Sequence, residues 1–173
     1  TDTINVGAGP SFSVLAGTDL YVTNTTANTV SVIDTTTNTV TDTIAVGTGP
    51  VFANLVGTDL YILNNGGSDV SVIDTSTNTV SATITVGTNP WSGTLVGTDL
   101  YVTNTGSNDV KVINTLTETV TATIAVGVHP RFTTLIGTDL YVINRFSNSV
   151  KIINTLTNTV TATIAVQTGP LIG

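Results

Sequence analysis

Apolar and polar residues alternate along most of this chain in short runs, and turn-forming residues separate the runs. One stretch shows the pattern in full and predicts strands at 51–56, 59–64, 69–74 and 79–86. Gly57 and Thr58 fit a two-residue type II′ hairpin, because glycine comes first. Asp74 can accept a hydrogen bond from the backbone two residues on, and Asn78 tolerates a left-handed turn conformation. No segment has helical spacing of its apolar residues.

The same pattern recurs about every 40 residues, most visibly in the GTDLY segments that begin at Gly17, Gly57, Gly97 and Gly137. Four antiparallel strands repeated at this period are typical of a β-propeller blade. We therefore predict an all-β protein, a β-propeller of four-stranded antiparallel blades. It would form a single domain over 1–173, with repeats at 11–50, 51–90, 91–130 and 131–170. An open β-solenoid or a stacked meander is the alternative.

The fourth strand of the unit occurs once more than the other three. Its copies are expected at 1–6, 41–46, 81–86, 121–126 and 161–166. One outer strand, within residues 1–10, is therefore surplus. A spare strand is a template for pairing with another chain, so we predict strand exchange between copies. The residues expected to take part are Thr1, Thr3, Ile4, Val6, Thr161, Thr163, Ile164 and Val166. A longer array of repeats, of which this sequence is a slice, would explain the extra strand equally well.

Three segments of the repeat resemble the YVTN repeat family of β-propellers. The YVTN-like segment begins at Tyr21, Tyr61, Tyr101 and Tyr141. A VIDTxTNTV segment covers 32–40 and 72–80, and TIAVGxGP covers 43–50. The resemblance extends over essentially the whole chain. It implies a propeller fold and an extracellular or cell-surface location, as in surface-layer proteins, but no particular activity, because such families share a scaffold.

Composition and charge narrow the range of partners. Thr, Val and Ile, which suit a pleated sheet, are abundant, while charged residues make up 9% of the chain, and there is no Cys or Met. No apolar run is long enough for a membrane-spanning helix. Up to Val86 the chain has seven Asp and no Lys or Arg, whereas the remainder holds all four bases. Nucleic acid is an unfavourable partner for such a chain. The asymmetry is either drift among surface positions or a means of head-to-tail contact.

The repeats differ most at one end of each blade, where the first strand begins and the second strand ends. The residue before the proline that recurs in each repeat is Gly, Asn or His, and the residue after that proline also varies. The second turn of the last repeat is RFSN, where the second repeat has NGGS. We predict a partner-binding site for a glycan or a surface protein here, because aromatic and Arg residues are common anchors. Its residues would be Trp91, His129, Arg131, Arg145 and Phe146. Alternatively, Trp91 fills the central channel and Phe146 covers an edge.

Catalytic and metal sites find little support in the sequence. His129 is the only histidine, and there is no Cys, so no His-rich or thiolate metal centre can form. A calcium site at Asp19, Asp59 and their repeats is a weaker explanation than turn chemistry, since each turn has a single Asp. Paired carboxylates of a glycosidase type remain an open alternative. We expect no enzyme activity, no cofactor and no bound metal.

Two functions follow from these expectations. The first is an extracellular structural protein that assembles with itself into a surface layer, a filament or biofilm matrix through terminal strand exchange. The second is an extracellular binding module that uses the face carrying Trp91 and Arg131. Deleting residues 1–6 would abolish assembly only under the first.

Overall fold

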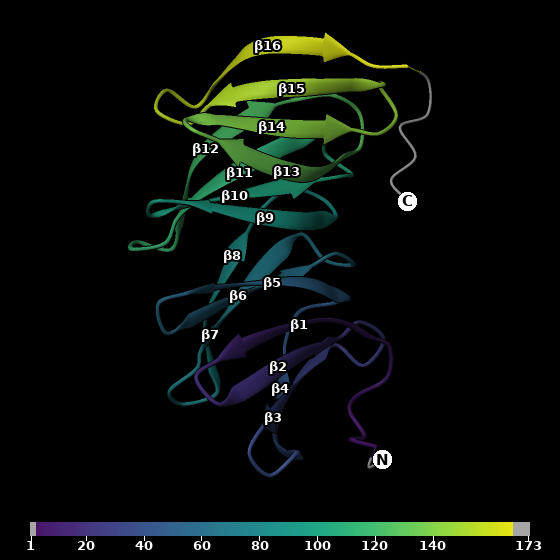
Figure 1. The fold of residues 1–173 in the computed structure, drawn as a ribbon, viewed down its shortest axis with the longest axis vertical. Helices are drawn as coiled ribbons and strands as arrows, with labels where there is room; N and C mark the ends of the chain where they lie inside the picture. Colours follow the sequence, from purple (N-terminus) through teal and green to yellow (C-terminus); the bar gives the residue numbers. More distant parts are fainter. Residues whose placement is uncertain (1–2, 168–173) are drawn as a thin grey trace. The chain divides into compact units, whose positions relative to one another are not determined.

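The computed structural model describes residues 3–167, which form sixteen β-strands in four antiparallel sheets of four strands each (Figure 1). We call these sheets blades 1 to 4. Contacts divide the chain into two compact units, residues 1–85 and 86–173. Each unit holds two blades. In every blade the strands pair in sequence order, as in a meander of hairpins.

Unit 1 contains blades 1 and 2. The strands of blade 1 are β1 (Pro10–Ala16), β2 (Asp19–Asn24), β3 (Thr29–Asp34) and β4 (Thr39–Ala45). Those of blade 2 are β5 (Pro50–Val56), β6 (Asp59–Asn64), β7 (Asp69–Asp74) and β8 (Thr79–Thr85). The strands expected at 51–56, 59–64, 69–74 and 79–86 are thus confirmed to within a residue at each end.

Unit 2 contains blades 3 and 4. The strands of blade 3 are β9 (Pro90–Val96), β10 (Asp99–Asn104), β11 (Asp109–Asn114) and β12 (Thr119–Ala125). Those of blade 4 are β13 (Pro130–Ile136), β14 (Asp139–Asn144), β15 (Ser149–Asn154) and β16 (Thr159–Ala165). Within residues 3–167 there is no helix with the length and apolar character needed to span a membrane.

The turn chemistry explains why these strands begin and end where they do. Gly57 has φ of 61° and Thr58 is not among the positive-φ residues, as a type II′ hairpin requires. The backbone N–H of Ser76 donates to Asp74 Oδ1 at 2.8 Å, and Asn78 has φ of 54°. All three turn predictions are confirmed. The same turns recur in the other blades, which is why the four sheets are so alike.

In the second strand of each blade a leucine and a tyrosine follow one another and point to opposite faces of the sheet. We call these the Leu face and the Tyr face. In blade 1 the Tyr face includes Tyr21, Val30 and Val32, while Leu20 and Val22 lie on the Leu face. In unit 1 the Tyr face of blade 1 packs against Leu60, Ile62 and Ile73 on the Leu face of blade 2. Burial of these apolar side chains is the main stabilising contribution.

Unit 2 repeats this arrangement. Tyr101, Val110 and Val112 of blade 3 pack against Leu140 and Val142 of blade 4. The phenol oxygen of Tyr101 lies 2.6 Å from Asn158 Oδ1 and 3.1 Å from the Thr155 carbonyl oxygen. Tyr21 makes the same contacts in unit 1, with Asn78 Oδ1 at 2.6 Å and the Thr75 carbonyl oxygen at 3.3 Å. In both units, therefore, the Tyr face of one blade packs on the Leu face of the next, and the tyrosine hydroxyl donates a hydrogen bond to that next blade. We call this arrangement the blade joint.

The pairing of the surplus strand with another copy stays a prediction. Residues 3–6, with Thr3, Ile4 and Val6, have no strand pairing within the described part of the chain, and Thr1 lies outside it. An extended segment forms a strand only beside a free ladder edge. The outer position of blade 4 is already taken by β16, which holds Thr161, Thr163 and Ile164, and Val166 follows that strand.

Two of the predicted exchange residues have partners within their own blade. The Thr161 hydroxyl donates to the Ile152 carbonyl oxygen at 3.3 Å, at a β-bulge that recurs in all four blades. Thr163 Oγ1 accepts a hydrogen bond from Lys151 Nζ at 2.7 Å. These residues therefore hold β16 in blade 4.

Candidate functional site

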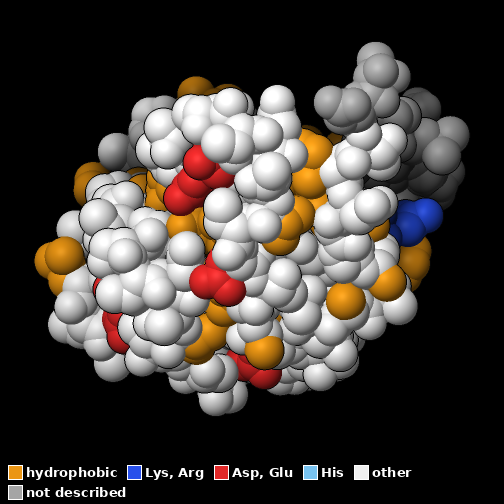
Figure 2. All heavy atoms as spheres, turned by 90° about the horizontal axis from the view of Figure 1, so that it is seen from below, with side chains coloured by type: hydrophobic (Ala, Val, Ile, Leu, Met, Phe, Trp, Pro, Cys, Tyr) orange, Lys and Arg blue, Asp and Glu red, His pale blue; other side chains and the backbone are white. Residues whose placement is uncertain are grey.

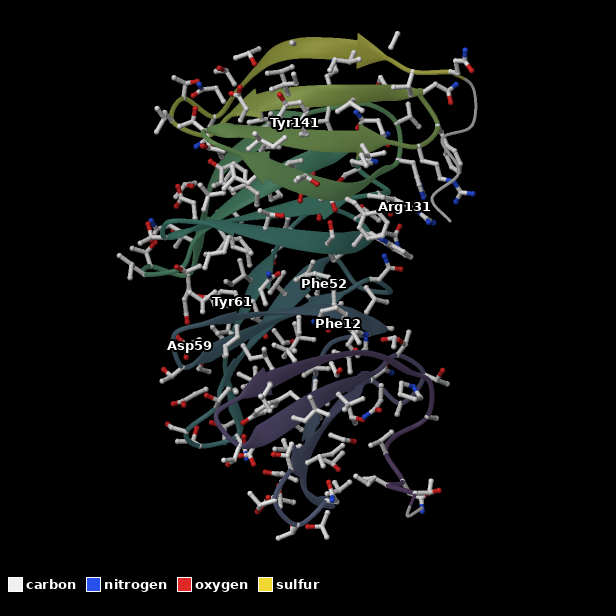
Figure 3. All side chains as sticks on the ribbon, viewed as in Figure 1. Phe12, Phe52, Asp59, Tyr61, Arg131 and Tyr141 are labelled. Carbon is white, nitrogen blue, oxygen red and sulfur yellow. The ribbon has the colours of Figure 1, made fainter. Side chains whose placement is uncertain are left out.

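The five predicted binding residues lie at one end of blades 3 and 4 and form two sets of ring contacts. The Arg131 guanidinium lies over the Trp91 ring, 4.4 Å from its centroid. His129 and Phe146 stack with ring centroids 4.4 Å apart and an interplanar angle of 25°. The Arg145 guanidinium lies 5.3 Å from the centroid of Phe146. We call Trp91, His129, Arg131, Arg145 and Phe146 the cationic cluster; Arg131 is labelled in Figure 3.

Backbone hydrogen bonds fix the two loops that carry His129, Arg145 and Phe146. The N–H of Arg145 donates to the His129 carbonyl oxygen, and the N–H of Phe146 donates to the Val128 carbonyl oxygen, both at 3.1 Å. The N–H of His129 donates to Asn108 Oδ1 at 2.9 Å. Trp91 and Arg131 lie at the starts of β9 and β13, and the three loop residues have their backbone donors already used. The recognition groups that the loops still offer are therefore side chains.

The variation before the conserved proline has a conformational explanation that the sequence alone did not reveal. Gly9, Gly49, Asn89 and His129 all have positive φ, between 54° and 71°. Gly, Asn and His tolerate this left-handed region better than most residues. The corresponding Gly169, and Leu171 after the next proline, lie outside the described residues. A histidine here is compatible with the backbone, but the backbone does not require it.

Among the described residues, no acidic group acts on the pKa of His129 or Arg131. Burial, and then the charges of Arg131 and Arg145, lower the pKa of His129 below its usual value. Burial and the charge of Arg145 lower the pKa of Arg131. Two buried polar atoms, Arg131 Nε and His129 Nε2, have no hydrogen-bond partner within the described part of the chain. An unpaired buried polar group is costly and calls for an explanation.

A second candidate region is the Tyr face of blade 4. Ile164 is 45% exposed, whereas the equivalent Ile44 and Ile124 are 6% and 5% exposed. Tyr141, labelled in Figure 3, is half-buried where Tyr101 is 1% exposed. Its hydroxyl forms no hydrogen bond to any residue within 3–167. This face has the composition of a blade joint without the cover that the joint in unit 2 provides.

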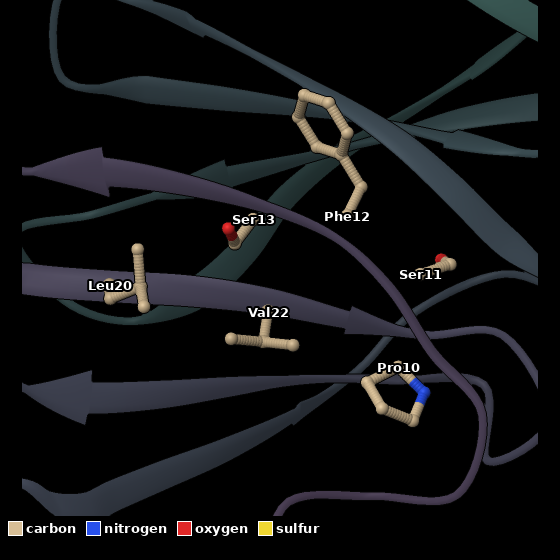
Figure 4. A pocket seen from close by; sticks show the side chains of 6 residues that line it. All are labelled: Pro10, Ser11, Phe12, Ser13, Leu20 and Val22. Carbon is tan, nitrogen blue, oxygen red and sulfur yellow. The ribbon is translucent and has the colours of Figure 1, made fainter.

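The Leu face of blade 1 is open in the same way. Leu15 is 55% exposed, and Leu20 and Val22 are half-buried, whereas Leu60 and Ile62 of blade 2 are fully buried. A cavity of about 470 Å³ lies against this sheet (Figure 4), lined by Pro10, Ser11, Phe12, Ser13, Leu20 and Val22. Periodicity alone could not indicate which faces stay uncovered, because every repeat has the same apolar pattern.

An acidic residue in a turn of blade 1 accepts hydrogen bonds from the residues that follow it in that turn. The pKa of this residue, Asp34, is lowered by hydrogen bonds from the Thr36 side chain and from the backbone of Thr36 and Thr37. No group of three or more His, Asp or Glu side chains that could hold a metal ion occurs among residues 3–167. Figure 2, a view from below, shows carboxylates scattered singly among polar and hydrophobic side chains.

Comparison with solved structures identifies the architecture. The chain is similar to Kuenenia stuttgartiensis hydrazine synthase, with a TM-score of 0.85 and 25% identity over 96% of this chain and 52% of that one. It is similar to BamB from Moraxella catarrhalis (TM-score 0.69, 17% identity, 88% and 47% covered). It also resembles AztD from Citrobacter koseri (TM-score 0.69, 12% identity, 96% and 49% covered). No family model and no curated protein matches the sequence.

These likenesses establish the fold and leave function open. The chain has the all-β architecture of β-propellers, with four-stranded antiparallel blades. It spans about half the length of the structures it matches. Propellers serve many unrelated functions, so the names of these neighbours do not transfer to this chain.

Proposed function

We propose that this chain is a non-catalytic, extracellular scaffold of the YVTN-repeat type that assembles with further copies of itself by stacking blades head to tail. The observation that supports this most directly is the pair of uncovered faces, the Tyr face of blade 4 and the Leu face of blade 1. They are chemically the two halves of the joint that both units already contain. Threonine-rich strands and low charge suit the close contacts of a surface layer or filament.

The internal joints indicate how the contact between copies would form. Tyr141 corresponds to Tyr21 and Tyr101, whose hydroxyls lie 2.6 Å from an Asn Oδ1 of the next blade. In blade 1 the acceptor position is occupied by Asn38, which is exposed, as is Thr35. Tyr141 of one copy would therefore donate to Asn38 Oδ1 and the Thr35 carbonyl oxygen of the next copy. Ile164 would become buried at the same joint.

Strand exchange is a second route to assembly, and the unpaired state of residues 3–6 favours it. Residues 3–6 have the same alternating pattern as 163–166, so they could replace the end of β16 in a neighbouring copy. Such an exchange would have to break the hydrogen bonds of Thr161 and Thr163 in blade 4. Blade stacking breaks none of the described contacts, so we give it priority.

Sedimentation velocity on three variants tests the proposal and separates the two routes. Blade stacking predicts that the unmodified chain sediments above its monomer mass of 17.7 kDa and that Ile164→Glu restores the monomer. Leu116→Glu is the matched control, because Leu116 is 78% exposed in a turn of blade 3, which carries neither open face. It should assemble normally. Deletion of residues 1–6 should abolish assembly only if strands are exchanged. A monomeric unmodified chain would refute both routes.

A further inference from the structure

We propose that the cationic cluster is a binding site for carboxylate-bearing saccharides, in particular runs of uronic acid residues in an acidic polysaccharide. This inference is independent of self-assembly, since none of the cluster residues is among those named on the two open blade faces. It starts from two guanidinium groups and a histidine, each of which lies against an aromatic ring.

The cluster has no acidic partner in the part of the chain that the structure describes. No carboxylate within residues 3–167 forms an ion pair with Arg131 or Arg145, and no acidic group acts on the pKa of either His129 or Arg131. Arg131 Nε and His129 Nε2 also have no partner there, but both atoms are buried and do not themselves face a ligand. A planar carboxylate matches the fork of guanidinium donors and forms charge-assisted hydrogen bonds with it.

The cluster is pre-organised for such a ligand. The Arg131 carbonyl oxygen accepts hydrogen bonds from Ser92 Oγ at 2.5 Å and from Thr103 Oγ1 at 2.8 Å, which fixes the backbone of this residue. The Trp91 ring supports its guanidinium at 4.4 Å. Holding the side chain in this way reduces the entropy lost on binding.

The nature of the available groups favours a saccharide over an acidic peptide. An extended peptide binds by adding main-chain hydrogen bonds to an open edge. Here the N–H groups of His129, Arg145 and Phe146 are used within the loops. What the cluster offers is side-chain cations beside Phe146, which is 60% exposed. A uronic acid ring combines a carboxylate with an apolar C–H face and fits both features.

The fold does not need the cluster, so its residues can be replaced without loss of the blade. In blade 2 the positions of Arg131, Arg145 and Phe146 are occupied by Val51, Asn65 and Gly66, and the same loops form there.

The charge of the second half of the chain also permits a polyanion to bind. Beyond residue 85 the acidic and basic side chains are equal in number, whereas all seven acids of residues 1–85 lie without a base.

Isothermal titration with hexagalacturonate at about 50 mM salt, where charge interactions are weakly screened, tests the site. Arg131→Gln and Arg145→Gln should each weaken binding about tenfold or more, as expected for a hydrogen bond between charged groups. Arg145 is exposed, so its variant is the safer one for folding. Lys151→Gln removes the same charge from β15 of the same blade and should leave affinity unchanged. Neutral maltohexaose should not bind.

Four results would overturn the proposal. These are no binding of hexagalacturonate, equal loss of affinity in Lys151→Gln, equal binding of maltohexaose, and tighter binding of hexaglutamate, which would indicate a peptide site. The only histidine of the chain supplies a second readout. A bound carboxylate should raise the pKa of His129, followed by NMR of its ring protons. An unchanged His129 titration in the saturated complex would place the ligand elsewhere and contradict the assignment.

Discussion

Removing the Tyr101 hydroxyl should weaken unit 2 by a measurable and bounded amount. Tyr101 is 1% exposed, and its hydroxyl lies 2.6 Å from Asn158 Oδ1 and 3.1 Å from the Thr155 carbonyl oxygen. Tyr101→Phe deletes one hydrogen bond of about 0.5–1.5 kcal/mol and leaves acceptors without a donor. Both acceptor residues are only half-buried, so water can satisfy them in part. We expect a total loss of about 1–2 kcal/mol.

For a chain of 173 residues such a loss lowers the melting temperature by roughly 2–8 °C. Circular dichroism melting at low protein concentration measures it. The matched control is Tyr141→Phe, because the Tyr141 hydroxyl has no hydrogen bond among the described residues and should change stability by less than about 0.5 kcal/mol. The reasoning fails if the two variants melt at the same temperature, because the interblade hydrogen bond would then contribute nothing.

Three further predictions concern single groups. Since the folded state lowers the pKa of His129, the unfolded chain binds more protons just below pH 6.5, and stability should fall as the pH drops through that range. Urea unfolding should show this slope, and it should be absent in His129→Asn. Gly57→Ala should cost about 1 kcal/mol in the same assay, because Gly57 has φ of 61° and no neighbouring atom lies within reach of an added methyl group. Finally, burial and the charge of Asp99 raise the pKa of Tyr101 to about 12, so one tyrosine should ionise near that pH in absorbance titration, and Tyr101→Phe should remove that step.

The blades could be predicted from the sequence because their determinants are local. Alternation at 59–64 and 69–74 fixes the strand faces, and Gly57 and Asn78 fix the turns between strands. These signals act over a few residues and repeat four times. The predicted extra strand at 1–6 was less secure, since a strand depends on a partner elsewhere in space as well as on its own pattern.

The candidate site could be predicted only in part. That Arg131, His129 and Phe146 would lie together followed from the order of the strands in a meander. The pairing of Arg131 with Trp91, and of His129 with Phe146, depends on side-chain rotamers that no periodicity encodes. Likewise, Ile44 and Ile164 occupy equivalent positions in nearly identical strands, yet one is buried and the other exposed. Their difference comes from what lies against each blade, which local sequence does not specify.

The most direct test of head-to-tail stacking is the mass of a mixture of two variants, each with one open face disabled. Leu15→Glu places a charge on the Leu face of blade 1, where Leu15 is 55% exposed, and Ile164→Glu places one on the Tyr face of blade 4. Each variant alone should be a monomer of 17.7 kDa by light scattering. Mixed in equal amounts, they retain one intact pair of faces and should form a particle of twice that mass. A mixture that stays at the monomer mass, or a single variant that assembles like the unmodified chain, would contradict the account.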